Sequence, residues 1–259
     1  MSEEAAEVDK STAPLLDHLI ELRNRLLWCV VALALCFGVC LYFASELFSF
    51  LVQPLVRAFP EGEGRMIYTR LYEAFFVEVK VAIFGAFVIA FPIIATQLWM
   101  FVAPGLYKNE KHAFLPFLLA TPLLFTTGAA LAYYVVMPTA FHWFLSFQGN
   151  VGGMSQEALP AVNDYLTLVM QFILAFGISF LLPVLLLLLE RAGIVSRKQL
   201  VGARRYAIVG AFIVAAVFTP PDVVSQLMLA IPLWMLYEIT MVILWFGERR
   251  KKPGKPSEA

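Results

Sequence analysis

Charged residues and catalytic motifs are both scarce in this sequence. Asp, Glu, Lys and Arg make up only 15% of its 259 residues, whereas soluble domains carry about 25%. It has no G-x-x-x-x-G-K-[ST] phosphate-binding loop, no H-E-x-x-H motif and no paired cysteines with zinc spacing. Its three histidines, His18, His112 and His142, are far apart. We therefore expect no enzyme, no nucleotide hydrolysis, no cofactor or metal, and no nucleic-acid partner.

Cysteine is also rare, and all three cysteines fall in one apolar run. Cys29, Cys36 and Cys40 are spaced by seven and four residues, which puts them on one face of a helix. A buried cysteine behaves as a small hydrophobic residue. We expect these three to pack against another helix.

Long apolar runs are what the sequence contains instead. Hydrophobic residues make up 61% of the chain and its mean hydropathy is +0.78. A helix needs about 20 mostly apolar residues to cross a bilayer, and no segment shows the alternation typical of a membrane barrel. We predict an all-α integral membrane protein, one domain over 1–259 with flexible tails at 1–13 and 248–259. Its six predicted transmembrane helices are 27–45, 74–102, 113–138, 160–189, 206–219 and 223–247.

Positive charge is distributed unevenly between the two sides of this predicted topology. The opposite side to the N-terminus carries only Arg57, Arg65 and Arg70 in its loops, and the remaining basic segments are 1–25, 103–112, 190–205 and 249–255. Positive loops remain cytoplasmic, so we expect both termini in the cytoplasm and the chain in the cytoplasmic membrane. Residues 1–14 are net acidic and no small-residue cleavage site follows the first apolar run, which indicates a retained anchor.

The fifth predicted span is unusually short. Arg205 and Pro220 leave room for about 14 residues, roughly 20 Å of helix. We expect a short fifth span and allow for a short sixth, with prolines bending several helices into a curved, concave arrangement. Asp222 is placed to cap the sixth helix. Glu238 should return to the level of Arg204 and Arg205 as a structural ion-pair partner.

Residues 15–26 form an amphipathic pattern before the first span. Leu15, Leu19, Leu22 and Leu26 make one apolar stripe, typical of a helix at the lipid interface. Arg23 and Arg25 suit an anchor, but Glu21 does not, because the inner leaflet is itself negative. Two explanations remain open for Glu21: an ion pair with Arg25 four residues later, or a functional site.

A second acidic residue lies at the same predicted membrane face. In "FVAPGLYKNEKH", residues 101–112, Glu110 stands among lysines. Two carboxylates on one face could bind a short cationic peptide, and the alternative is local pairing with Lys108 or Lys111.

Several motifs in order resemble one known family. "HLIELRNRLL" at 18–27, "FVAPGLYKNEKH" at 101–112 and "TPPDVVSQLMLAIPLWMLYE" at 219–238, with "FPII" at 91–94 and "AYYVVMPTAF" at 132–141, resemble TatC. TatC is the multi-spanning core component of the twin-arginine protein translocase. The resemblance implies six helices, binding of twin-arginine signal peptides of folded precursors, transport with TatA- and TatB-type partners and other copies of itself, and use of the proton-motive force. A proton-coupled small-solute transporter, with Glu238 or Asp222 as proton carrier, is the alternative.

The resemblance also implies roles for single residues. Glu21 and Glu110 correspond to the carboxylates that contact the signal-peptide arginines, and Arg23 shapes that site. Supporting or structural positions are Leu19, Arg25, Pro54, Pro92, Tyr107 and Asp222. Thr219 and Gln226 correspond to the docking face for partner helices. Leu181 departs from the family pattern, where an acid or amide is common, so partner docking at that residue must use its neighbours or be weaker.

Overall fold

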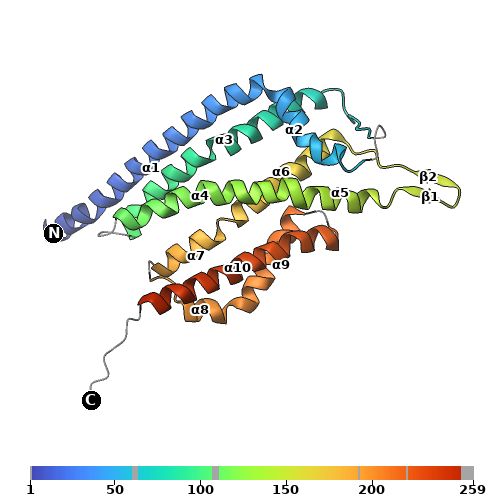
Figure 1. Ribbon diagram of the computed structural model, residues 1–259. Coiled ribbons are helices and arrows are strands. Elements are labelled where there is room, and N and C mark those ends of the chain that lie inside the picture. The colour runs from blue at the N-terminus through green and yellow to red at the C-terminus, as the bar shows by residue number, and fades with distance from the viewer. Residues whose placement is uncertain (1, 60–63, 107–110, 192, 220, 252–259) are drawn as a thin grey trace, which may run out of the picture. The chain divides into compact units, whose positions relative to one another are not determined.

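The computed structural model describes residues 2–59, 64–106, 111–191, 193–219 and 221–251 (Figure 1). Side chains are described within 18–59, 64–101, 117–150, 152–191, 193–219 and 221–247. The elements in chain order are α1 (Ser2–Tyr42), α2 (Ala44–Val56), α3 (Glu73–Leu106), α4 (Lys111–Leu131), the π-helix η1 (Ala132–Val136), α5 (Met137–Leu145), β1 (Gly149–Val151), β2 (Met154–Gln156), α6 (Val162–Ser179), α7 (Leu182–Arg191), α8 (Arg197–Gly202), α9 (Arg204–Phe218) and α10 (Val223–Lys251).

Helices of membrane-spanning length confirm most of the predicted spans. His18–Tyr42, Glu73–Phe101, Phe117–Leu145, Val162–Arg191 and Val223–Gly247 are long and apolar enough to cross a bilayer. The predicted span 206–219 is α9, whose 15 residues extend over about 22 Å, short of a hydrocarbon core of about 30 Å. The allowance for a short sixth span was wrong. Helix α10 has 29 residues, because Pro232 lies within the helix without ending it.

The chain divides into two compact units. Unit 1 comprises residues 1–48 and 78–122, and unit 2 comprises residues 49–77 and 123–259. The single-domain organisation, its tails, the side on which each terminus lies and the concave arrangement stay predictions.

In unit 1, small side chains bring α1 and α3 together. Cys40, Ala82 and Ala86 are buried in one cluster, with Cys36 packed against it. A Cβ added to Gly85 would lie 3.0 Å from the Leu47 side chain and 3.3 Å from Cys40 Sγ. Small residues let membrane helices approach closely, so the predicted packing role is confirmed for Cys36 and Cys40.

Two glycines allow α4 and α6 to pack closely within unit 2. A Cβ on Gly128 of α4 would lie 2.5 Å from the Phe176 carbonyl oxygen, and one on Gly177 of α6 would lie 2.6 Å from the Phe125 ring. Gly128 and Gly177 are both buried. Neither position has room for a larger residue without moving backbone or a buried aromatic ring.

The fourth predicted span is interrupted at Phe180 and Leu181. The α6 helix ends at Ser179 and α7 begins at Leu182. Pro183 explains the interruption, because proline has no amide hydrogen for the i−4 carbonyl and its ring clashes with that turn.

A short strap joins the segment before α3 to the start of α6 in unit 2. Ile67 N donates to the Pro160 carbonyl at 3.2 Å, and Val162 N donates to the Ile67 carbonyl at 3.0 Å. The carboxylate of Glu73, buried at 6% exposure, accepts hydrogen bonds from both Thr69 donors, from Arg70 N and, at 3.0 Å, from Asn163 N.

The connection between α7 and α9 is also fixed within unit 2. Ser196 and Gln199 form a reciprocal capping box at the start of α8. Tyr237 of α10 donates its hydroxyl hydrogen to the Leu200 carbonyl at 2.6 Å. A buried cluster holds α8 against α10. It consists of Leu200 from α8 and of Tyr237, Met241 and Leu244 from α10.

Candidate functional site

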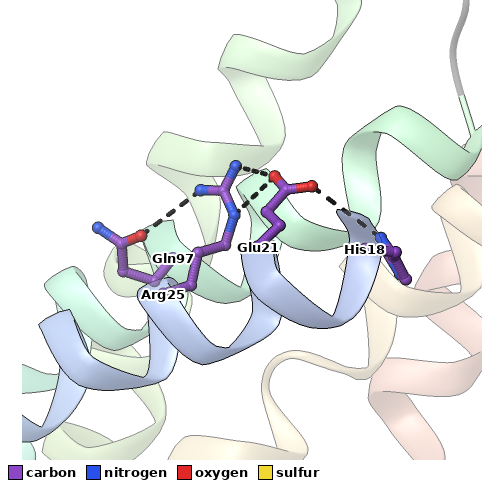
Figure 2. Close-up of polar contacts among 4 residues, drawn as sticks. All are labelled: His18, Glu21, Arg25 and Gln97. Atoms are coloured by element: carbon purple, nitrogen blue, oxygen red, sulfur yellow. Dashed lines mark hydrogen bonds and ion pairs between the residues drawn. The ribbon is translucent and has the colours of Figure 1, made fainter. Parts of the chain in front are cut away.

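Glu21 forms an ion pair with Arg25 on the same helix (Figure 2). Arg25 Nε donates to Glu21 Oε1 at 2.9 Å, and Arg25 Nη2 donates to the same oxygen. The i to i+4 spacing puts the two side chains one turn apart on one face of α1. The ion-pair explanation for Glu21 is therefore confirmed. It does not exclude a functional role, since 35% of the Glu21 side chain is exposed.

Polar side chains lie on both sides of this ion pair, Gln97 of α3 and His18 of α1. Arg25 Nη1 lies 3.5 Å from Gln97 Oε1, and His18 Nδ1 lies 4.0 Å from Glu21 Oε2. The His18 ring stacks on Phe101 with centroids 4.3 Å apart. Figure 2 shows the Arg25 guanidinium between Gln97 and Glu21, with His18 beyond the carboxylate. The pair is thus held between two polar side chains rather than left free on the surface.

An open recess of about 440 Å³ adjoins the ion pair. Its lining combines a carboxylate, a guanidinium, two amides and an aromatic ring, from Ile20, Glu21, Asn24, Arg25, Trp28 and Gln97. Trp28 is 65% exposed, so its ring is available to an incoming group. A carboxylate beside an exposed indole suits a cation carried on an apolar stem.

Other predicted residues of this site are only partly placed. Arg23 is exposed and donates to Asn24 Oδ1 at 3.4 Å, and Leu19 is 59% exposed. Tyr107 and Glu110 lie outside the described residues, so the pairing of Glu21 with Glu110 stays a prediction. Pro92 is exposed on α3, and its carbonyl accepts a hydrogen bond from Thr96 Oγ1 at 2.7 Å.

The predicted ion pair of Glu238 is confirmed with one of its two candidate partners. Arg204 Nη2 lies 2.8 Å from Glu238 Oε2. Arg205 instead donates to the Tyr206 hydroxyl at 3.0 Å and lies over that ring. Consecutive residues on a helix point about 100° apart, so only one of the two arginines faces α10.

Asp222 caps α10 as predicted. Ser225 N donates to Asp222 Oδ2 at 2.7 Å, which satisfies one of the amide hydrogens left free at a helix start. Pro54, the other structural position outside unit 1, is fully buried within α2.

The predicted docking residues lie in unit 2 with differing exposure. Thr219 is buried and donates to the Ala215 carbonyl at 2.8 Å. Gln226 is half-buried, and its Nε2 donates to the Phe212 carbonyl at 3.3 Å. Leu181 is half-buried in the turn between α6 and α7. Thr219 also lines a cavity of about 950 Å³ beside Asn163, Thr167 and Gln171 of α6.

Sequence reasoning missed Gln97 and Trp28. Gln97 was detectable as a lone amide within the apolar segment 74–102. Trp28 stands one turn after Asn24, but nothing local distinguishes it from an interfacial aromatic residue.

The fold and the membrane-length helices define a multi-spanning helical membrane protein, a class that includes receptors and transporters. The family model for the Sec-independent protein translocase protein TatC matches residues 17–232. The chain therefore belongs to the TatC family, a family of transport proteins. This confirms the resemblance seen in the sequence.

Relatives and solved structures agree with this family. The chain is 48% identical to the Sec-independent protein translocase protein TatC of Magnetococcus marinus over 95% of its own length and 88% of the relative. Identity to the TatC protein of Escherichia coli K12 is 40%, over 89% and 87% of the two chains. A crystal structure of the twin-arginine translocase receptor TatC superimposes with a TM-score of 0.78 at 38% identity, covering 87% of this chain and 98% of that one.

Proposed function

We propose that this chain is the receptor component of a twin-arginine translocase, and that Glu21 belongs to its site for the signal peptides of folded precursors. Family membership supports the general role. The observation that supports the site is the Glu21 carboxylate, which already engages a guanidinium at the edge of an open recess. We place this site on the cytoplasmic side, in agreement with the distribution of positive charge.

The chemistry of the recess favours arginine over lysine. A guanidinium presents planar, paired donors that match a carboxylate, whereas an ammonium acts as a single point charge. Trp28 offers a ring face on which a guanidinium can stack. Glu110 is proposed as the second carboxylate, so that each arginine of the signal meets one acidic residue.

The remaining parts of the proposal concern partners and energy. TatA- and TatB-type single-span proteins would dock near Gln226, and the buried Thr219 would contribute through the cavity that it lines. Leu181 offers no polar group, so docking there would depend on neighbours. Other copies of the chain complete the complex in the cytoplasmic membrane, and the proton-motive force drives transport.

A proton-coupled solute transporter is the weaker alternative. Glu238 is tied to Arg204 and Asp222 Oδ2 caps α10, so both acidic residues have structural tasks. The alternative predicts solute flux in liposomes that contain this chain alone, whereas a receptor gives none without partners and a precursor.

The direct test measures binding of a twin-arginine signal peptide and its twin-lysine variant to the full chain in lipid nanodiscs. A charge-assisted hydrogen bond contributes about 1.5–3 kcal/mol, so Glu21→Gln should raise the Kd of the twin-arginine peptide roughly 10-fold or more. Glu157→Gln, at an exposed acid on the opposite side of the predicted topology, is the matched control. Unchanged binding by Glu21→Gln combined with Glu110→Gln would refute the site.

A further inference from the structure

A cavity in unit 2 has polar walls although membrane-length helical segments form part of it. It measures about 950 Å³ and is lined by residues of α5, α6 and the end of α9, among others. Three polar side chains of α6 line it: Asn163, Thr167 and Gln171. Their spacing of four residues places them on one face of the helix. Thr219, just after α9, lines the same cavity, so this polar cavity receives polar groups from two elements.

Gln171 lies deepest of the three along α6. It is exposed, and within the residues that the structure describes its amide has no hydrogen-bond partner. The helix begins at Val162, so Gln171 lies about 13 Å along its axis. An amide without partners is strongly disfavoured in hydrocarbon, because neither its donors nor its acceptor is satisfied there. Water in the polar cavity satisfies this amide, whereas lipid tails leave it unpaired.

The hairpin of α9 and α10 is too short to reach across a full hydrocarbon core. The ion pair of Arg204 and Glu238 joins the two helices, and each helix extends about 22 Å from this pair to the turn between them. We place the pair at a membrane surface, because charges are costly inside hydrocarbon. A core about 30 Å thick then reaches about 8 Å beyond the turn. Val217 and Thr219, which line the polar cavity, therefore lie inside the far boundary of the core.

A second cavity at the same hairpin has the opposite chemistry. This apolar groove measures about 420 Å³, and Thr139 is the one polar residue among those that line it. Its lining includes Val135 of η1 and Val224 of α10. Apolar cavities stay dry, whereas polar cavities with enough room take up water. We therefore expect the apolar groove to hold lipid tails.

We propose that the polar cavity is an aqueous notch in the membrane, filled by water as far as Val217. The apolar layer beside α9 is then about 20 Å thick instead of about 30 Å. For a chain that crosses the membrane here, the notch shortens the layer in which peptide groups find no hydrogen-bond partner. This inference goes beyond the proposed receptor function and depends neither on Glu21 nor on a signal peptide.

The test uses two valines that flank the turn of the hairpin, one in each cavity. Val217 lies just before the turn and lines the polar cavity, and Val224 lies just after it and lines the apolar groove. Val217→Cys and Val224→Cys are made singly in the full chain, placed in lipid nanodiscs and treated with a positively charged methanethiosulfonate. Intact mass counts the adducts, and wild type with its three cysteines is the blank. Val217→Cys should react at least about 100-fold faster, because the charged reagent is excluded from hydrocarbon.

Two further variants keep the result interpretable. Val135→Cys is the control for accessibility, because Val135 is 54% exposed and Val217 is 68% exposed; it should react as slowly as Val224→Cys. Gln171→Cys should react as fast as Val217→Cys, and it decides the matter if Val217→Cys does not accumulate in the membrane. In sodium dodecyl sulfate all four variants should react alike, which shows that each thiol is present.

The outcomes separate this inference from the proposed function. Similar rates for Val217→Cys and Val135→Cys in nanodiscs would overturn the notch. Two slow thiols would mean that lipid tails fill both cavities, and two fast ones would mean that the bilayer thins around this whole region of unit 2. Neither result affects the preference for a twin-arginine peptide, which tests the proposed function by itself.

Discussion

The chain contains two Glu–Arg ion pairs whose surroundings differ. Glu21 and Arg25 lie one turn apart on α1, whereas Arg204 and Glu238 are 34 residues apart and join α9 to α10. Both pairs are partly exposed: 35% and 22% for the first, 49% and 29% for the second. The exposed fraction therefore does not distinguish the two pairs. They differ in the elements that they connect.

The connected elements determine what breaking each pair would do. The Glu21–Arg25 pair spans one helix turn, and α1 persists without it because its backbone hydrogen bonds and apolar contacts remain. The Arg204–Glu238 pair closes a helical hairpin next to Tyr237, which is bonded to Leu200. The first pair therefore ties together only one helix turn, whereas the second ties two helices together.

The largest expected effect on stability comes from reversing the charge of the hairpin pair. Glu238→Arg places two guanidinium groups against one another and should lower the free energy of unfolding by about 1–2 kcal/mol, moderated by solvent screening. Thermal unfolding of the purified protein in detergent measures this. The double change Glu238→Arg with Arg204→Glu should restore the lost stability. Equal rescue by Arg205→Glu would contradict the assignment of Arg204 as the partner.

The cap of α10 is the next test of the same hairpin. Asp222→Ala removes the acceptor for Ser225 N and should cost about 1 kcal/mol. Asp222→Asn, which keeps an acceptor oxygen, should cost less than half as much. Equal melting temperatures for the alanine and wild-type proteins would show that the cap contributes nothing to the hairpin.

A buried neighbour of Glu238 gives an effect of similar size. Tyr237→Phe leaves the Leu200 carbonyl without its donor and should destabilise the protein by about 1 kcal/mol. Tyr206→Phe is the control, because the Tyr206 side chain is 64% exposed. If both variants unfold at the same temperature, α8 is not held through Tyr237.

The smallest expected effect on stability belongs to the pair on α1. Glu21→Gln should change the free energy of unfolding by less than about 0.5 kcal/mol, although the same variant should lose peptide binding. A large drop in melting temperature would make Glu21 a structural residue and remove the contrast with Glu238.

The sequence predicted contacts that follow from local spacing. The Glu21–Arg25 pair and the Asp222 cap both follow from separations of three or four residues on a helix. The short α9 followed from the distance between Arg205 and Pro220. These features need no knowledge of how distant segments pack.

Features that depend on packing could not be predicted in this way. Whether Arg204 or Arg205 faces Glu238 depends on the rotation of α9 about its axis, and the approach of Gln97 to Arg25 depends on how α3 lies against α1. Thr219 was predicted on the docking face for partner helices, but its hydroxyl donates to a carbonyl of its own helix and its side chain is buried.

The strap at Glu73 has a consequence for the order in which the protein is made. Its carboxylate takes a hydrogen bond from an amide 90 residues later in the chain, at Asn163. During synthesis, two further membrane-spanning segments are therefore made after Glu73 before its last hydrogen-bond donor, Asn163 N, leaves the ribosome. Until then, we expect hydration of this charge to keep the beginning of α3 in water, because a carboxylate is costly to move into lipid. One acidic residue thus joins the start of α3 to the start of α6 only after translation has reached Asn163.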